Sequence, residues 1–452
     1  MTELSHDATQ PAIAHLDQAK PDDERNVTRA ALAALIGTML ENYDFVVYGT
    51  ASALVFSKVF FPSISPQAGI IASFSAYAIG FLARPLGGLF FSHYGETLGR
   101  KWVLVSTLFL MGGATFAIGC LPTYATLGIW APVLLVTCRF LQGFGAGAEQ
   151  SGGATLLTET APLGKRGRLS SLVMVGAALG TVAGALAWIA VQQLPDEALA
   201  SWGWRAIFWS SILVTITAFI IRRKLAESPV FIELKKKVDV EHRAPLHEVA
   251  RYGLKNVIKV ILMNWGVSTQ SYTYQVFMIS YLISVVRFDA HAIPPLQLAA
   301  SICAAIAAFA AGYLSDRLGR RSMTLFITGV LVVTPFLVFP GLNTGSPLLI
   351  AGLLIFGYMF AAQGVTGVHM SFFPEMFGSR YRYAGVTLGR EFSSIIGGGI
   401  APLVCAALLA WSGNAWFPVA LYMALTMLVS FVTTCTVPET LDRDLNSPDD
   451  AV

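Results

Sequence analysis

Gly95-Glu96-Thr97-Leu98-Gly99-Arg100-Lys101 and Ser315-Asp316-Arg317-Leu318-Gly319-Arg320-Arg321 are two copies of one polar loop, separated by about half of the chain. Each copy follows one hydrophobic segment and precedes another. A loop that recurs at such an interval indicates a duplicated unit. The pair therefore predicts a membrane protein built from two related halves.

The composition also indicates a membrane protein. Of the 452 residues, 55% are hydrophobic and only 13% are charged, and the mean hydropathy is +0.62. A helix needs about 20 apolar residues to cross a hydrocarbon layer of about 30 Å. Twelve such stretches are expected, at 30–56, 67–92, 102–121, 128–156, 169–192, 204–222, 258–286, 296–314, 322–341, 347–372, 384–410 and 414–436. The predicted fold class is an all-α membrane protein with twelve transmembrane helices.

A long polar interruption divides these stretches into six and six. The predicted domains are an N-terminal tail over 1–29, a six-helix bundle over 30–222, a linker over 223–257, a second bundle over 258–436 and a C-terminal tail over 437–452. Smaller repeats have a similar offset, because Gln142-Gly143 matches Gln363-Gly364. Two bundles related by a pseudo-two-fold axis would enclose a binding site near the middle of the membrane.

Basic residues predict the orientation, since Lys and Arg accumulate in loops that remain in the cytoplasm. One set of alternating loops contains most of them: Arg100, Lys101, Lys165, Arg166, Arg168, the run from Arg222 to Lys259, Arg317, Arg320, Arg321, Arg380 and Arg382. The opposite set contains only Lys58, Arg205 and Arg287. Both termini are therefore expected in the cytoplasm. This bias explains the net charge of +3 without a nucleic-acid partner.

Several motifs spread over most of the chain point to one family. They are Glu41-Asn42-Tyr43-Asp44-Phe45, Arg84-Pro85-Leu86-Gly87-Gly88, Arg139-Phe140-Leu141-Gln142-Gly143, Gly203-Trp204-Arg205, Tyr381-Arg382-Tyr383-Ala384-Gly385 and Pro438-Glu439-Thr440. Together they resemble the metabolite:proton symporters of the major facilitator superfamily, which include shikimate, α-ketoglutarate and proline/betaine carriers. Two further stretches, Trp130-Ala131-Pro132 and 373–378, look closest to shikimate-type members. The resemblance implies a multi-pass, monomeric carrier of a bacterial inner membrane, driven by a proton gradient and without a bound cofactor.

Ionisable residues inside the predicted spans are candidates for proton coupling. Each costs about 2.5 to 3.5 kcal/mol at the centre of a membrane unless it has a partner or faces water. Asp44 lies roughly 18 Å from the outer end of its span and Arg139 roughly 16 Å from the outer end of its own, so the two are expected to meet near the midplane. We assign proton coupling to Asp44, Arg139, Glu41 and Glu149. The alternative is a static ion pair that joins two helices.

Polar side chains in the same spans are candidates for substrate binding. They are Tyr43, Arg139, Gln142, Asn264, Gln270, Tyr274, Gln363 and Arg390. Such a set suits a small hydroxylated or ring-bearing carboxylate. Relatives tend to have Tyr or another uncharged residue where this chain has Arg390. This arginine either binds a substrate carboxylate or forms a salt bridge with Glu149 or Glu391, whereas a structural role is favoured for Arg84.

The repeated loops are interpreted as conformational latches that stabilise the state closed to the cytoplasm. Glycine permits the tight turn, and the acid can cap a neighbouring helix and pair with the arginine. The latch residues are Glu96, Gly99 and Arg100 in the first copy and Asp316, Gly319 and Arg320 in the second. The alternative is that these loops are only basic topology signals.

These features favour proton-coupled uptake of a small organic acid by alternating access. Uptake of a zwitterionic osmolyte such as proline or betaine, and a non-transporting sensor on the same fold, remain alternatives. No His-x-x-x-His, no Gly-x-Ser-x-Gly with partners and no phosphate-binding Gly-x-x-x-x-Gly-Lys motif is present. The five cysteines lack the spacing of a metal site. The sequence thus predicts neither an enzyme nor a metal site.

Overall fold

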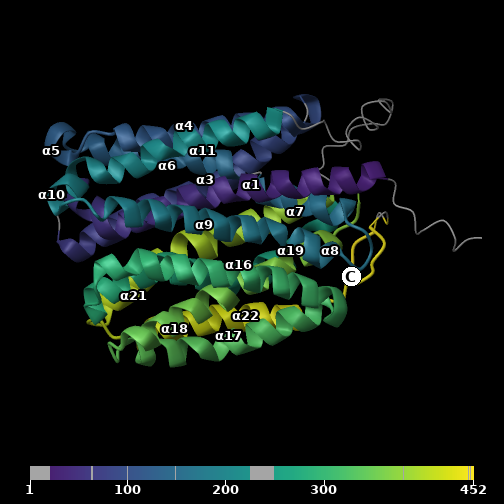
Figure 1. Ribbon diagram of the computed structural model, residues 1–452. Helices are drawn as coiled ribbons and strands as arrows, with labels where there is room; N and C mark the ends of the chain where they lie inside the picture. Colours follow the sequence, from purple (N-terminus) through teal and green to yellow (C-terminus); the bar gives the residue numbers. More distant parts are fainter. Residues whose placement is uncertain are drawn as a thin grey trace, which may run out of the picture.

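The computed structural model describes residues 21–62, 65–98, 100–147, 149–223, 249–379, 381–445, 447 and 449–451. Most of the predicted N-terminal tail, 1–29, and of the predicted linker, 223–257, lies outside these ranges. Within them, every regular element is a helix (Figure 1). The all-α prediction is therefore confirmed for the described part of the chain.

The first half of the molecule comprises the helices from α1 to α11. Its long elements are α1 (Pro21–Ala51, continued by η1, Ser52–Phe56, and α2, Ser57–Val59), α3 (Pro66–Leu98), α4 (Arg100–Cys120), α6 (Trp130–Ala146), α7 (Glu149–Thr160), α9 (Leu172–Val191) and α11 (Trp204–Arg223). Short elements between them are α5 (Tyr124–Leu127), α8 (Arg166–Ser170), α10 (Asp196–Ala198) and η2 (Leu199–Gly203).

The second half comprises the elements from η3 to α22. They are η3 (Val249–Gly253), α14 (Leu254–Tyr272), η4 (Thr273–Phe277), α15 (Met278–Tyr281), η5 (Leu282–Val286), η6 (Ala290–Ala292), α16 (Ile293–Leu318), α17 (Arg320–Leu342), α18 (Pro347–Gly357), η7 (Tyr358–Gly364), α19 (Val365–Met376), α20 (Arg382–Ser393), η8 (Ser394–Gly399), α21 (Ile400–Trp411) and α22 (Phe417–Cys435). The wider π-helical turns η4, η7 and η8 interrupt three long helices. Such turns often lie at functional sites.

The helical segments account for all of the expected spans. Nine segments of the described chain are long and apolar enough to cross a membrane. Another shorter apolar helix, Val105–Cys120, lies within α4, and α11 and the α14–α15 segment supply the remaining two. Outward-facing side chains such as Leu213, Ile306, Phe326 and Leu337 are 65–67% exposed, which is typical of a surface that contacts lipid.

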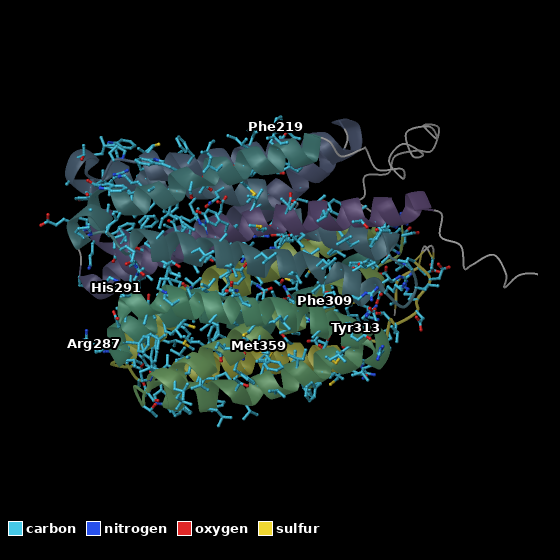
Figure 2. All side chains as sticks on the ribbon, viewed as in Figure 1. Phe219, Arg287, His291, Phe309, Tyr313 and Met359 are labelled. Atoms are coloured by element: carbon cyan, nitrogen blue, oxygen red, sulfur yellow. The ribbon has the colours of Figure 1, made fainter. Side chains whose placement is uncertain are left out.

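The two halves meet along several helices, and α7 packs against α19 and α20. Helix α9 packs along α16, and α3 packs against α20, η8 and α21. Figure 1 shows the first half above the second, with α9 beside α16. The start of α1 and the C-terminal segment lie at the same end of the bundle in this view. Arg287 and His291 lie at the opposite end from Tyr313 (Figure 2).

Glycines allow α3 and α6 to approach each other closely inside the first half. A Cβ atom on Gly143 of α6 would overlap the carbonyl oxygen of Gly80, and one on Gly147 would overlap that of Arg84. Neither neighbour is the movable end of a side chain. Glycine is therefore required at these two positions for the close helix contact that places Arg139 and Arg84 beside α1.

Gly143→Ala is expected to destabilise the protein by about 3 kcal/mol, because the new methyl group can fit only if the two helix backbones move apart. Thermal unfolding of the purified protein in detergent measures the effect. Gly113→Ala in α4 is the matched control, since a Cβ atom at Gly113 meets no atom within 4 Å. Equal unfolding temperatures for the two variants would contradict the close approach of α3 and α6.

Candidate functional site

A chain of buried hydrogen bonds links Asp44 of α1 to Arg139 of α6. The Thr115 hydroxyl donates to Asp44 Oδ2 at 2.8 Å. Gln142 Nε2 donates to the Thr115 oxygen at 2.7 Å, and Arg139 Nη1 donates to Gln142 Oε1. The direct ion pair expected between Asp44 and Arg139 is not formed, because the Gln142 amide and the Thr115 hydroxyl lie between them.

The guanidinium of Arg139 is surrounded by aromatic rings. Its central carbon lies 4.3 Å from the ring centres of Phe45 and Tyr48 and 4.6 Å from that of Tyr77. Arg139 is completely buried, and within the described chain its Nε and Nη2 atoms have no hydrogen-bond partner. The faces of the rings stabilise the cation in place of a carboxylate.

A small cavity joins Asp44 to Glu149 inside the first half. It has a volume of about 10 Å³, and Ser211 and Thr215 contribute hydroxyl groups to its wall. Leu40, Leu108 and Met111 form much of the rest of the wall, and a cavity of this size has room for about one water molecule. The cavity therefore brings two of the predicted coupling residues, Asp44 and Glu149, to one space.

A second group of charges lies between the two halves. Arg84 Nη1 is 2.7 Å from Glu41 Oε1, and Arg84 Nε is 2.6 Å from Glu391 Oε2. The exposed fraction of each side chain is only 1–3%. Glu41 and Arg84 belong to the first half and Glu391 to the second. Sequence reasoning had favoured a structural role for Arg84 and had assigned no role in the site to Glu391.

Arg390, next to Glu391 in α20, also reaches the first half. Its Nη2 atom donates to Gln150 Oε1 at 2.6 Å, and its Nη1 atom lies 3.3 Å from the sulfur of Met370. A salt bridge of Arg390 with Glu149 or Glu391 was the alternative to substrate binding. In the structure Arg390 instead bonds to Gln150, the residue that follows Glu149. The useful sequence signal was the pair of opposite charges inside one apolar span, since both members need partners.

Three predicted binding residues point into their own bundles. The Tyr43 hydroxyl bonds to Ser210 at 2.7 Å, Gln270 Nε2 donates to the Leu331 carbonyl at 2.9 Å, and Asn264 Nδ2 donates to Ser393 Oγ at 2.7 Å. Two others keep unused polar atoms: within the described residues, Tyr274 Oη and Gln363 Oε1 have no hydrogen-bond partner. The assignment of these five residues to substrate binding remains a prediction.

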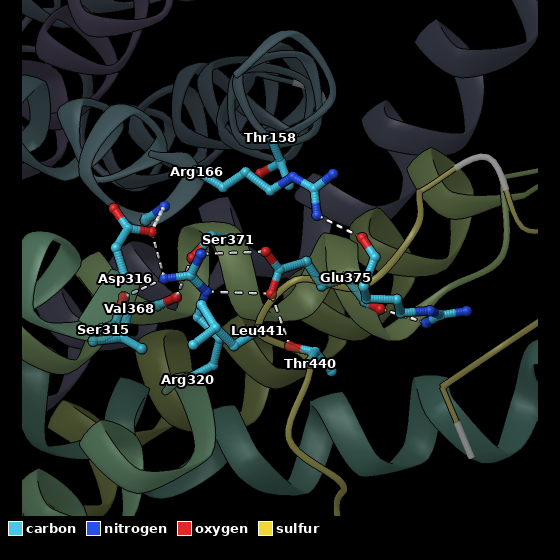
Figure 3. Close-up of polar contacts among 12 residues, drawn as sticks. Thr158, Arg166, Ser315, Asp316, Arg320, Val368, Ser371, Glu375, Thr440 and Leu441 are labelled. Atoms are coloured by element: carbon cyan, nitrogen blue, oxygen red, sulfur yellow. Dashed lines mark hydrogen bonds and ion pairs between the residues drawn. The ribbon is translucent and has the colours of Figure 1, made fainter. Parts of the chain in front are cut away.

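The second repeated loop forms a dense cluster with both halves (Figure 3). Asp316 accepts hydrogen bonds from the backbone nitrogens of Gly167 and Arg168, at 2.7 and 2.8 Å, at the start of α8. Arg320 lies between Asp316, at 2.8 Å, and Glu375, at 3.2 Å. We call Asp316, Arg320 and Glu375 the Arg320 cluster. It connects the second half to the first at the end of the bundle that contains the C-terminal segment.

The C-terminal segment strengthens the same end of the molecule. Thr440 Oγ1 donates to Glu375 at 2.8 Å, and Arg166 Nη1 of the first half donates to the Arg443 carbonyl at 2.6 Å. Arg382 forms an ion pair with Glu159 at 2.9 Å. The Arg166–Arg443 and Arg382–Glu159 contacts cross between the halves, so they hold this end closed.

The two copies of the loop differ in what the structure describes. Gly99 and the side chains of Glu96 and Arg100 lie outside the described residues. In the second copy, Gly319 has φ +96°, a conformation that side chains rarely adopt. The Glu439 carboxylate also accepts a hydrogen bond from the Arg320 backbone nitrogen at 2.7 Å, and so caps the start of α17.

Comparison with known proteins identifies the family. The sequence model of the Major Facilitator Superfamily matches residues 29–389. The chain belongs to this superfamily. It is therefore a membrane transporter, not an enzyme, and its helices form the superfamily's two six-helix bundles.

Two relatives from Escherichia coli K12 cover nearly the whole chain. The chain is 36% identical over 411 residues to a shikimate transporter, covering 90% of this chain and 93% of that protein. It is 32% identical over 433 residues to a proline/betaine transporter, covering 94% and 86%. Among solved structures, the proton:xylose symporter XylE bound to 6-bromo-6-deoxy-D-glucose has a TM-score of 0.75 at 16% identity, covering 94% of this chain and 98% of that one. This last likeness concerns the fold alone.

Proposed function

We propose that this transporter couples proton uptake to the import of a small carboxylate metabolite across a bacterial inner membrane. It works as a monomer, by alternating access, and needs no bound cofactor. The observation that carries the proposal is the buried chain from Asp44 through Thr115 and Gln142 to Arg139. Glu149 lines the same small cavity as Asp44.

Asp44 suits proton exchange because its carboxylate is held by a hydroxyl group rather than by a cation. A proton can therefore arrive or leave without breaking an ion pair. The hydroxyl of Thr115 donates to the ionised carboxylate at 2.8 Å and can rotate when the carboxyl group becomes neutral. Rotation would change the bonds of Gln142 and then of Arg139. Proton occupancy and the position of Arg139 are thus coupled through neighbouring side chains.

Alternating access requires the contacts of the Arg320 cluster with the first half, those of Asp316 with the Gly167 and Arg168 backbone, to separate and re-form. We place this end of the bundle, with both chain termini, in the cytoplasm, because the loops there are the basic ones. Closure by Asp316 and by the Arg382–Glu159 pair stabilises the state that faces away from the cytoplasm. Opening of this end would expose the charges between α3 and α20 to water.

A carboxylate is the group that the candidate substrates share. Shikimate, proline and betaine, which name two of the relatives, all contain one. The buried guanidinium groups of Arg84 and Arg390 lie where the two halves meet, and guanidinium binds carboxylates through paired hydrogen bonds. A carboxylate metabolite is therefore the substrate class that this interface fits best.

Transport by the purified protein in liposomes tests the proposal. Whichever of radiolabelled shikimate and betaine is a substrate should exchange across the liposome membrane. A pH gradient, acidic outside, should then drive its accumulation inside. With the membrane potential clamped at zero, one pH unit sustains about tenfold accumulation for one proton per substrate. Exchange without accumulation would contradict proton coupling. Absence of exchange over a panel of carboxylates would favour a sensor.

A further inference from the structure

Glu391 occupies the carboxylate-binding edge of Arg84. Its Oε2 atom lies 2.6 Å from Arg84 Nε, and its Oε1 atom lies 3.4 Å from Arg84 Nη2. This is the side-on, two-point arrangement in which guanidinium groups bind free carboxylates. Glu41 contacts only the remaining Nη1 atom, at 2.7 Å. The Nε/Nη2 edge of Arg84 is thus filled from the opposite half of the protein.

The group of charges between the halves is divided when the halves separate. The first half keeps Arg84 with Glu41, and the second half keeps Arg390 with Glu391. Opening leaves the Nε/Nη2 edge of Arg84 without its partner, because Glu391 moves away with α20.

We propose that the Nε/Nη2 edge of Arg84 binds the substrate carboxylate, and that Glu391 occupies this edge when no substrate is bound. The proposal rests on the proposed function, because it requires a carboxylate substrate. Glu391 is then an internal competitor. It keeps the buried guanidinium paired in the empty carrier, and it displaces the substrate when the halves close again.

The surroundings of Arg84 suit the rest of such a molecule. Its guanidinium carbon lies 5.3 Å from the ring centre of Phe45 and 5.7 Å from that of Phe81. The Tyr272 ring of the second half meets Phe81 edge-on, with centres 5.0 Å apart. Aromatic rings from both halves can therefore pack against the ring or methyl groups of a substrate whose carboxylate is held by Arg84.

Two other arginines that are buried within the predicted spans, Arg139 and Arg390, are less suitable. Arg139 lies inside the first half, within the rings of Phe45, Tyr48 and Tyr77. Arg390 donates to the neutral amide of Gln150 and to a sulfur atom. Of these three arginines, Arg84 is the one that already binds a carboxylate from the opposite half in the described part of the chain.

Removal of the internal competitor should tighten substrate binding and slow its release. The apparent affinity of a site falls in proportion to the fraction of the protein in which the site is free. We therefore expect Glu391→Gln to bind shikimate, or betaine if that is the substrate, roughly tenfold more tightly. Its maximal transport rate should fall. A lower Kd together with a lower turnover distinguishes competition from a simple loss of structure, which would weaken binding as well.

Isothermal titration calorimetry on the full-length protein in detergent, with shikimate and with betaine as the probes, measures these affinities. Arg84→Lys keeps the charge but loses the two-point geometry, so we expect at least roughly tenfold weaker binding. If Glu391→Gln does not fold, Glu391→Asp keeps the charge and shortens the side chain by one methylene group. It should withdraw from Arg84 and also bind more tightly than the wild type.

Glu375→Gln is the matched control. It also removes a buried carboxylate that contacts an arginine side-on, but this carboxylate lies in the Arg320 cluster. Equal tightening in Glu375→Gln and Glu391→Gln would show that easier opening, rather than a removed competitor, is responsible, and would overturn the proposal. So would an unchanged Kd in either Glu391→Gln or Arg84→Lys. Wild-type protein that binds neither probe nor any other carboxylate would overturn the proposed function as well.

Discussion

Asp44→Asn is expected to exchange substrate at a measurable rate but to lose accumulation driven by a pH gradient. The amide can accept the same hydrogen bond from Thr115 as the carboxylate does, at 2.8 Å in the wild type, so the local structure should be kept. It cannot bind and release a proton in the physiological range. The accumulation ratio under an imposed gradient of one pH unit should fall from about tenfold to about one.

Counterflow and gradient-driven uptake in the same liposomes measure the two activities separately. Asp289→Asn is the matched control. It is the same substitution at an exposed residue just before η6, where the Asp289 side chain accepts a hydrogen bond from the His291 backbone nitrogen. This control should accumulate substrate like the wild type. Accumulation at the wild-type level by Asp44→Asn would refute the coupling role of Asp44.

Arg320→Gln is expected to destabilise the closed end of the bundle by about 3–5 kcal/mol, the usual effect of leaving a buried charge without its partner. Glu375 is completely buried, and Arg320 is its cationic partner at 3.2 Å. The substitution also removes the bond from Arg320 to Asp316. We therefore expect a lower unfolding temperature and a larger separation of the halves at this end.

Distances between spin labels measure that separation directly. Leu163 in the first half and Leu318 in the second are exposed and suit labelling after the native cysteines are replaced. Arg321→Gln is the matched control, since its side chain donates to the Cys435 carbonyl rather than to a buried acid. The double variant Arg320→Gln/Glu375→Gln should recover part of the lost stability. Identical distances and unfolding temperatures in Arg320→Gln and Arg321→Gln would contradict the role of the cluster.

Much of the fold could be predicted because membrane insertion is a local property. Each span must supply about 20 apolar residues and satisfy its own backbone hydrogen bonds. Windows of sequence therefore predicted helices that the structure confirms, and the repeated loops predicted the two-bundle fold. The depth of Asp44 and Arg139 followed from the same reasoning, at about 1.5 Å per residue.

The partners of the buried charges could not be predicted in this way. One position along a helix rotates a side chain by about 100°, so neighbours such as Arg390 and Glu391 face different helices. That rotation, and the contact of α20 with α3 and α7, decided that Glu391 meets Arg84 while Arg390 meets Gln150. Likewise, the Gln142 amide and the Thr115 hydroxyl lie between Asp44 and Arg139, and depth alone does not reveal them.

The sequence by itself determined that this protein crosses the membrane repeatedly in two related halves, and which ionisable residues lie within the membrane. Only the tertiary structure decided how those residues are paired. The physical reason is that insertion depends on the composition of each segment alone, whereas a buried ion pair depends on the position and rotation of two helices that are distant in the chain.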